Sequence, residues 1–465
     1  MRLITRDKSF YRSLFALAIP VAIQNLITFS VNFADNLMVS SLGDAAVSGV
    51  YMGNQLQTFL QMFSGGIEGA ILILAAQYWG RRDTASIRKI VAIGIHFSVI
   101  FALLLTAVCL IIPKPILSIF STDASVIAQG AEYLRIVCLS YLFFCITQSL
   151  IASMRSVEVA RIGMLVSSIS LVVNVSLNYI LIFGKLGIQP MGIKGAAIAT
   201  VISRMVESAV MIFYVAKVDK TLNMKWSDLL HSDKVLRRDF LKNGLPVVGG
   251  NVVWSINLMT STAILGRFTA PVTAAVSIAN TMNALAYVVM NGMGAAVGVI
   301  TGKTVGAGKM ETMKEYARTV QLMFLGVGIL TGSFMYLTKD LFIGLYSMTG
   351  DGGITPEAVM YAKQMMTVLS VTAVGTCYQA ACLAGLVKAG GDVSFVFKND
   401  TIFVFLVVLP SAIIAQMLGA PAWMVFACLK CDQILKCFVA VVKINSFNWM
   451  KNLTRSNPKA EEAEA

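Results

Sequence analysis

The chain has 465 residues, of which 57% are hydrophobic and 13% charged, and its mean hydropathy is +0.75. A soluble domain carries about 25% charged residues, so this composition excludes a soluble globular protein and indicates a polytopic membrane protein. A net charge of +13 would suit a nucleic-acid-binding protein, but here loops between membrane segments account for the basic residues, and no nucleic-acid partner is required.

Apolar stretches long enough to cross a bilayer recur along the whole chain. A transmembrane helix needs roughly 20 apolar residues. The predicted spans of the first half are residues 13–39, 47–76, 91–112, 131–153, 162–184 and 192–216. Those of the second half are residues 241–265, 272–301, 317–338, 357–387, 394–417 and 421–443. The sequence therefore predicts an all-α membrane protein with twelve transmembrane helices.

The basic residues orient this predicted topology. Most of the 37 Lys and Arg residues fall in the termini and in alternate loops, and the opposite loops hold only Lys114, Lys185, Lys194, Arg267 and Lys339. By the positive-inside rule, both termini are predicted to be cytoplasmic. The protein is predicted to be a multi-pass protein of the plasma membrane, which is the inner membrane in a cell with two membranes. The tail 450–465 is predicted to be disordered.

The two halves of the chain resemble each other at an offset of 226 residues. Pro20 corresponds to Pro246, Asn54 to Asn280 and Gly80 to Gly306. Because each half holds an even number of spans, both enter the membrane from the same side, which is a parallel repeat. We therefore predict two pseudo-symmetric six-helix bundles, residues 1–216 and 241–449, joined by a cytoplasmic linker at 217–240.

Asp35 is a carboxylate inside the first apolar span. An ionised carboxylate in hydrocarbon costs at least about 2.5 kcal/mol, so Asp35 must face a cavity, hold a proton or have a partner. Gln24, Thr28 and Asn32 fall on the same side of this helix, which favours a cavity. The alternative is a structural residue that is hydrogen-bonded to a neighbouring helix.

Polar stripes follow equivalent helices of the two halves. Polar groups are costly against lipid, so these stripes face either an aqueous cavity, which we favour, or a neighbouring helix to which they hydrogen-bond. The candidate substrate-cavity residues, with the three from the first span, are Asn54, Gln57, Gln61 and Glu68 in the second span and Asn280, Asn283, Tyr287 and Asn291 in the eighth. The fifth span adds Asn174 and Asn178, and the sixth adds Thr200. Ser261 stands at the position equivalent to Asp35, so only the first half carries this acid.

Other charged residues lie within the predicted spans. Arg204 and Glu207 are one helical turn apart and are predicted to pair with each other. Lys430, Asp432 and Lys436 are predicted to neutralise one another. The sequence leaves open whether Glu68, Asp400 or Asp432 takes part in function.

Several segments together resemble the multidrug and toxic compound extrusion (MATE) transporters. They include Ala18-Ile19-Pro20, the Gln77-to-Gly80 segment, the Asn174-to-Gly184 segment and Ala389-Gly390-Gly391-Asp392. The resemblance implies two six-helix bundles that export cationic or amphipathic compounds in exchange for H+ or Na+. It also implies a cation site in the first bundle formed by Asp35, Asn174, Asn178 and Thr200. Several members have an acid where this chain has Asn178, so either coupling ion stays open here.

These observations predict a secondary antiporter rather than an enzyme, since no HExxH motif, paired Asp motif or nucleophile elbow lies in a span. We expect a bend at Pro20 to couple ion binding to the cavity. The expected partners are the lipid bilayer and small organic cations or amphipathic compounds. The protein is expected to be a monomer without a cofactor or a metal. The alternative function is a lipid or polysaccharide flippase, which predicts several basic residues in the cavity. The substrate and the physiological role do not follow from the sequence.

Overall fold

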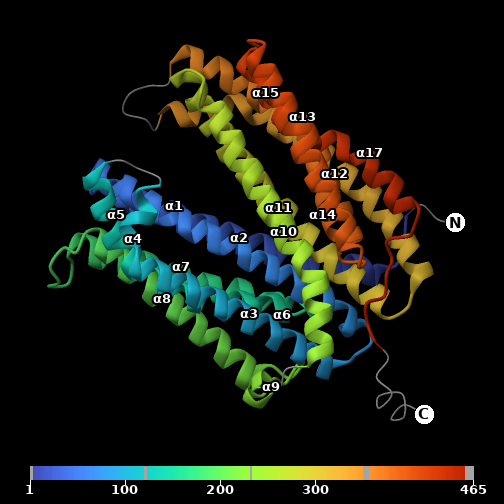
Figure 1. The fold of residues 1–465 in the computed structure, drawn as a ribbon. Coiled ribbons are helices and arrows are strands. Elements are labelled where there is room, and N and C mark those ends of the chain that lie inside the picture. The colour runs from blue at the N-terminus through green and yellow to red at the C-terminus, as the bar shows by residue number, and fades with distance from the viewer. Residues whose placement is uncertain (1–3, 120–122, 231–232, 349–354, 456–465) are drawn as a thin grey trace.

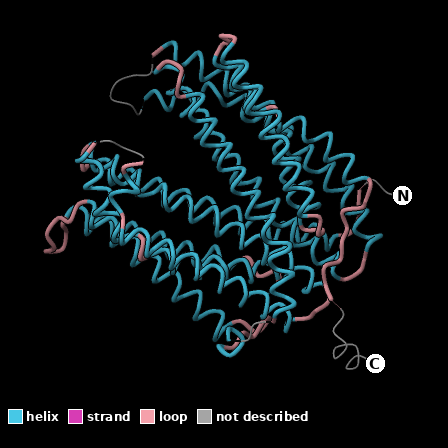
Figure 2. The backbone as a smooth tube through the Cα atoms, viewed as in Figure 1, coloured by secondary structure: helices cyan, strands magenta, loops and turns pink. Residues whose placement is uncertain are grey.

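The computed structural model describes residues 4–119, 123–230, 233–348 and 355–455. Within these ranges the regular structure is entirely helical, and Figure 2 shows helices joined by loops.

The first half of the chain folds into an N-terminal bundle. Its helices are α1 (Lys8–Ser40), α2 (Asp44–Gly80), α3 (Thr84–Ile111), α4 (Pro113–Leu117), α5 (Ala124–Val137), α6 (Ser140–Ser156), α7 (Arg161–Phe183) and α8 (Ile193–Phe213). A π-helical turn, η1 (Tyr214–Val218), and the short α9 (Trp226–Leu230) lead to the second half.

The second half forms a C-terminal bundle. Its elements are α10 (Lys234–Leu265), α11 (Ala270–Gly306), α12 (Met310–Met348), α13 (Pro356–Gln379), η2 (Ala380–Lys388), α14 (Val393–Ile402), η3 (Phe403–Val408), α15 (Leu409–Met417), α16 (Ala422–Lys430) and α17 (Asp432–Asn445). The π-helical segments η2 and η3 continue the helices that precede them.

The predicted spans correspond to these helices. Among the described residues, ten helices are long and apolar enough to cross a membrane, and α5 with α6, bent by 51°, provide an eleventh. The expected last span, residues 421–443, is broken at Cys431 into α16 of 9 residues and α17 of 14 residues. The prediction of an all-α protein with twelve helices in two bundles is confirmed.

Figure 1 shows how the two bundles are arranged. They lie against each other at the end of the molecule that holds both chain termini, and they diverge toward the end that holds α4 and α15. We call these the terminal end and the distal end.

Aspartate caps begin the first helix of each half. The Asp7 carboxylate accepts a hydrogen bond from the Ser9 amide, and that of Asp233 accepts from the Val235 and Leu236 amides. Asp7 and Asp233 are themselves separated by the repeat offset of 226. Because Asp233 caps α10, the helix starts at Lys234 within the stretch predicted as the linker.

Glycines let the bundles approach each other, and their contacts repeat at the same offset. A Cβ on Gly66 would lie 2.5 Å from Val248, and one on Gly292 would lie 2.8 Å from Ala22. These four positions form two contacts related by the offset of 226, so the repeat seen in the sequence is a pseudo-two-fold relationship in space.

The same relationship holds nearer the terminal end, where α2 crosses α11. A Cβ on Gly80 would lie 2.1 Å from the Lys303 oxygen, and one on Gly306 would lie 1.9 Å from the Gln77 oxygen. No side chain fits at either position, so two glycines set how closely these helices cross.

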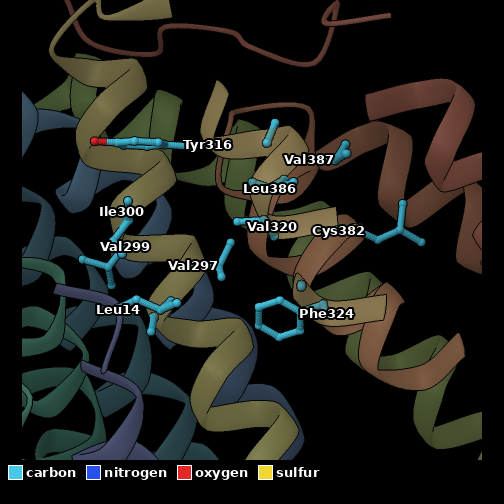
Figure 3. Packing of buried hydrophobic residues seen from close by; sticks show 14 of the residues in the cluster. Leu14, Val297, Val299, Ile300, Tyr316, Val320, Phe324, Cys382, Leu386 and Val387 are labelled. Carbon is cyan, nitrogen blue, oxygen red and sulfur yellow. The ribbon is translucent and has the colours of Figure 1, made fainter. Parts of the chain in front are cut away.

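A hydrophobic core continues from one bundle into the other. Figure 3 shows Leu14 of α1 beside Val297 and Ile300 of α11, and the same cluster continues to Phe324 of α12 and Leu386 of η2. Since Leu14 and Phe324 are at most 1% exposed, this cluster holds the bundles together by apolar burial.

The prediction of a disordered tail from residue 450 is wrong for residues 450–455. These residues pack against both bundles, and Trp449, just before them, is fully buried. A polar composition suggested disorder, but hydrogen bonds and ion pairs with residues far away in the sequence hold this segment.

Candidate functional site

The N-terminal bundle contains a polar cavity of about 240 Å³. It lies between α1, α2, α5, α7 and α8, so helices from the start and the end of the bundle enclose it. Its lining residues are Val31, Asn32, Asp35, Asn36, Tyr51, Asn54, Gln55, Gln57, Thr58, Gln61, Tyr133, Asn174, Thr200, Ser203 and Arg204.

Asp35 lies in this cavity and is bound by α7. The Asn178 side-chain amide donates a hydrogen bond to the Asp35 carboxylate and another, of 3.2 Å, to the Asn174 oxygen. Asn174 and Asn178 are each 1% exposed. The two asparagines are one turn apart on α7, so packing of α7 against α1 brings the Asn178 amide to the carboxylate, and Asn174 accepts from the same amide.

One buried oxygen beside Asp35 has no donor. The Asn178 Oδ1 atom makes no hydrogen bond within the described part of the chain. A buried acceptor left in this way costs free energy unless a ligand or water satisfies it. Carboxylate and amide oxygens are the ligand types that hard cations prefer.

Thr200 brings a further oxygen to the cavity from α8. Its hydroxyl donates a hydrogen bond of 3.0 Å to the Ala196 carbonyl one turn earlier, so its oxygen lone pairs stay available. Of the four residues of the predicted cation site, Asp35, Asn174 and Thr200 line the cavity, and Asn178 is hydrogen-bonded to Asp35 and Asn174.

The cavity also contains an ion pair. Arg204 Nη1 lies 2.5 Å from Glu207 Oε2, and the Ser170 hydroxyl donates to the same oxygen at 3.3 Å. The predicted pairing of Arg204 with Glu207 is confirmed. Since Glu207 compensates the guanidinium, Asp35 is the acid of this lining that lacks an ion-pair partner among the described residues.

The cavity collects some of the predicted substrate residues. Asn32, Asn54, Gln57 and Gln61 all contribute to its lining. The Asn54 side-chain oxygen accepts a hydrogen bond of 3.1 Å from the Tyr133 hydroxyl, which fixes that part of the wall.

Gln24, Thr28 and Glu68 lie outside this cavity. Gln24 is buried and accepts from Arg155 at 3.2 Å, whereas the exposed Thr28 donates to the Gln24 carbonyl. Glu68 accepts from the Ser64 hydroxyl at 3.1 Å. On α1, the face that carries Gln24, Thr28, Asn32 and Asp35 therefore lines the cavity only at Asn32 and Asp35.

The stripe of the C-terminal half is also separate. None of Asn280, Asn283, Tyr287 and Asn291 belongs to the cavity lining. They lie on α11, whose contacts with α1 and α2 are made by its glycines and apolar residues. The structure brings Asn32, Asn54, Gln57 and Gln61 of the first half into one cavity and leaves these four residues of the second half outside it.

The sequence did not predict that two aromatic residues line the cavity. It predicted only that Arg204 pairs with Glu207, and not that Arg204 lines the cavity. Tyr51 and Tyr133 line the cavity, but tyrosines near the ends of apolar helices carry no distinctive pattern. The one available signal is helical spacing, since Tyr51 lies one turn before Asn54 and Gln55 on the polar side of α2.

Pro20 lies inside α1, which continues through it as one helix of 33 residues. Pro246 occupies the equivalent place inside α10. A bend at Pro20 that is coupled to ion binding stays a prediction.

The fold and the cavity define a polytopic helical membrane transporter. The MatE family model matches residues 20–180 and 246–420, which is most of both halves, so the chain belongs to the MatE family. Members of this family are transporters and not enzymes. The resemblance seen in the sequence is confirmed.

Curated relatives are similar along much of their length. An uncharacterized transporter of Bacillus subtilis, YisQ, is 23% identical over 394 residues, which cover 84% of this chain and 83% of the relative. A probable multidrug resistance protein NorM of Rhizobium meliloti is 26% identical over 338 residues, covering 72% of each. The relatives support efflux transport as the general activity.

Solved structures share the fold. The Vibrio cholerae MATE transporter VcmN in the bent form matches with a TM-score of 0.83 at 18% identity, covering 94% of this chain and 97% of that one. The eukaryotic MATE transporter AtDTX14 matches with a TM-score of 0.81 at 20% identity, covering 98% and 99%.

Proposed function

We propose that this protein is a secondary antiporter that exports cationic or amphipathic organic compounds in exchange for H+ or Na+. The observation that carries the proposal is the Asp35 carboxylate, held by Asn178 in a polar cavity and lacking an ion-pair partner among the described residues. One such acid can bind one transported cation at a time.

The donor set suits either coupling ion. For Na+, the proposed ligands are oxygens of Asp35, Asn174 and Thr200, which line the cavity, and of Asn178, which is hydrogen-bonded to Asp35. For H+, Asp35 itself takes the proton, and neutralisation weakens its hold on a cationic compound. In both cases ion and compound compete for Asp35, which couples the uphill export to the downhill ion.

Alternating access requires the bundles to separate at one end while they close at the other. We assign the terminal end to the cytoplasm because most Lys and Arg residues flank it. The bundles diverge at the distal end (Figure 1), so this conformation corresponds to access from outside.

The test measures uptake of an organic cation into inverted vesicles across which an ion gradient is imposed. A fluorescent organic cation should accumulate under either a pH gradient or a Na+ gradient, and the effective gradient identifies the coupling ion. Asp35→Asn should abolish this accumulation, while Asp340→Asn, which changes an exposed acid at the distal end of α12, should retain it. Undiminished accumulation with Asp35→Asn would refute the proposal.

The flippase alternative predicts several basic residues in the cavity for phosphate groups. Among the described residues, the lining holds one basic side chain, Arg204, and Glu207 compensates its charge. The names of the multidrug relatives also favour export of organic compounds over lipid transport.

A further inference from the structure

Residues 447–455 leave α17 and run across the terminal end of the molecule. They are anchored first to the C-terminal bundle. The Trp449 indole is fully buried and donates to the Ile444 carbonyl at 3.0 Å, and the Lys451 amide donates to the Gly390 carbonyl at 2.7 Å. Gly391 has φ of 102°, and a Cβ there would lie 2.5 Å from the Lys451 oxygen, so only glycine admits the chain this closely.

Charged contacts strengthen this anchoring. Lys451 Nζ lies 2.8 Å from Asp392, which also pairs with Lys443 of α17 at 2.7 Å. The Arg455 guanidinium donates to both oxygens of Asp239 on α10, at 2.6 and 2.8 Å. This fork-like pairing is the stronger kind of charge-assisted hydrogen bond.

The same segment is bound to the N-terminal bundle through the end of α2. Gln77, which is 0% exposed, accepts from the Leu453 amide at 2.7 Å and donates to the Lys451 and Ala389 carbonyls at 3.3 and 3.1 Å. The Arg455 amide donates to the Tyr78 hydroxyl at 3.3 Å. The Gln77 side chain of α2 thus forms hydrogen bonds with Ala389, Lys451 and Leu453 of the second half.

Leu453 adds an apolar contact at the junction. It packs against Ile73 of α2, Val247 of α10 and Val393 of α14. These three residues come from both bundles and are each at most 4% exposed. Separation of the bundles at the terminal end would expose this cluster.

Among the described residues, the opposite flank of the pseudo-symmetric interface keeps a larger cavity. Ser13 of α1, at the position equivalent to Asp239, lines a cavity of about 1,090 Å³ together with Glu158, Lys303 and Tyr316. Asp239 instead lines a remnant of about 240 Å³ beside Lys451 and Arg455. Residues 447–455 therefore fill on one flank the space that stays open on the other.

We propose that residues 447–455 form a strap that holds the two bundles together at the terminal end, and that this strap must leave α2 before that end opens. Its ion pairs among the described residues join it to the C-terminal bundle, whereas its contacts with the end of α2 are hydrogen bonds with Gln77, Tyr78 and, at 3.4 Å, Arg81. The strap consequently stays with the C-terminal bundle, and Gln77 is the point of release. The inference rests on the alternating access proposed above.

The experiment measures distances between the bundles without any substrate or gradient. Spin labels are placed at Lys220 and Lys309 for the terminal end and at Lys114 and Met417 for the distal end, in a variant with the eight native cysteines replaced. Double electron–electron resonance is then recorded on the full chain, on a chain that stops before Lys451, and on Gln77→Met. A chain that stops before Ser456 keeps the strap and is the matched control.

We expect two variants, the chain truncated before Lys451 and Gln77→Met, to populate the open terminal end more than the full chain does. In each variant, the population with a longer distance between the labels at Lys220 and Lys309 should rise by roughly tenfold, since several buried hydrogen bonds are lost. The distal pair should shorten in parallel, and the control should match the full chain. Distances unchanged in both the truncation and Gln77→Met would overturn the strap. If the truncated chain does not fold, Gln77→Met decides. Absence of gradient-driven export by the full chain would refute the antiporter and leave these distances unaffected.

Discussion

The Asn178 side-chain amide donates a hydrogen bond to the Asp35 carboxylate across 143 positions of sequence. This contact joins α7 to α1 and orients the buried Asn178 oxygen, which has no donor within the described residues. In the proposed cation site, the residue at position 178 therefore decides how many negatively charged oxygens are available to a cation.

Replacing Asn178 by Asp should make the site prefer Na+. A second carboxylate beside Asp35 adds a charged ligand, and we expect Na+ to bind at least about tenfold more tightly, equivalent to about 1.4 kcal/mol. Thermal unfolding of the purified protein in a Na+ titration, with K+ as the balancing ion, measures this affinity.

The double variant Asp35→Asn with Asn178→Asp is the control, because it returns the site to a single carboxylate. It should lose the added Na+ stabilisation. Equal Na+ dependence in Asn178→Asp and the unmodified chain would contradict the assignment of these oxygens as ligands.

Removing Glu207 should destabilise the protein strongly. The Glu207 side chain is 2% exposed and pairs with Arg204, whose side chain is 12% exposed, so Glu207→Ala leaves a largely buried guanidinium without its partner, at a cost of about 3 kcal/mol. The Lys314–Glu311 pair has the same spacing in its helix, but Glu311 is 76% exposed. Glu311→Ala should change the free energy of unfolding by less than about 1 kcal/mol. Similar losses in the two variants, measured by unfolding in detergent, would show that burial of the Arg204 pair is unimportant.

Adding one methyl group at Gly306 should force α11 away from α2. The new Cβ of Gly306→Ala would lie 1.9 Å from the Gln77 carbonyl oxygen, which belongs to the backbone and cannot rotate aside. We expect a loss of about 1–3 kcal/mol and a lower thermal midpoint. Gly326→Ala on α12 is the matched control because nothing lies within 4 Å of its Cβ. A thermal midpoint equal in the two variants would contradict the close crossing.

Acid should remove the contribution of Asp392 to stability. Burial alone would raise the pKa of this loop carboxyl, but hydrogen bonds from Lys443 and Lys451 outweigh burial and lower its pKa below the ordinary value of 3.8. Asp239, Lys242 and Arg455 line the same small cavity. A lowered pKa in the folded state stabilises the fold above the ordinary pKa, and this contribution is lost as the pH falls through the lowered value.

The thermal midpoint of the unmodified protein should thus exceed that of Asp392→Asn by a constant amount from about pH 5 upward. The difference should disappear as the pH falls well below about 4. A difference that persists unchanged at the lowest pH at which the protein folds would show that Asp392 acts through packing rather than charge.

Much of the fold could be predicted from the sequence because it depends on local chemistry. In lipid, a helix must form its backbone hydrogen bonds internally, so long apolar stretches identify transmembrane helices. The length of these stretches alone located nearly all the spans. The offset shared by Pro20 and Pro246 and by Gly80 and Gly306 indicated the pseudo-two-fold, which the contacts of Gly66 and Gly292 reproduce.

The candidate site was less predictable. Helical spacing placed Gln24, Asn32 and Asp35 on one face, but it gives no depth along the helix, so it grouped Gln24 with a cavity that Gln24 does not line. Likewise the stripe on α11 matched that on α2 in pattern, although only α2 meets α5, α7 and α8 around the cavity.

By itself, the sequence determined that the protein is a duplicated helical membrane protein with one acid in its first span, because hydrophobicity and helical period act within a few residues. Only the tertiary structure decided that Asn178 binds Asp35 and that residues 447–455 bind Gln77. These contacts join residues far apart in the chain, and their energies depend on burial and on distances that exist only once the helices have packed together.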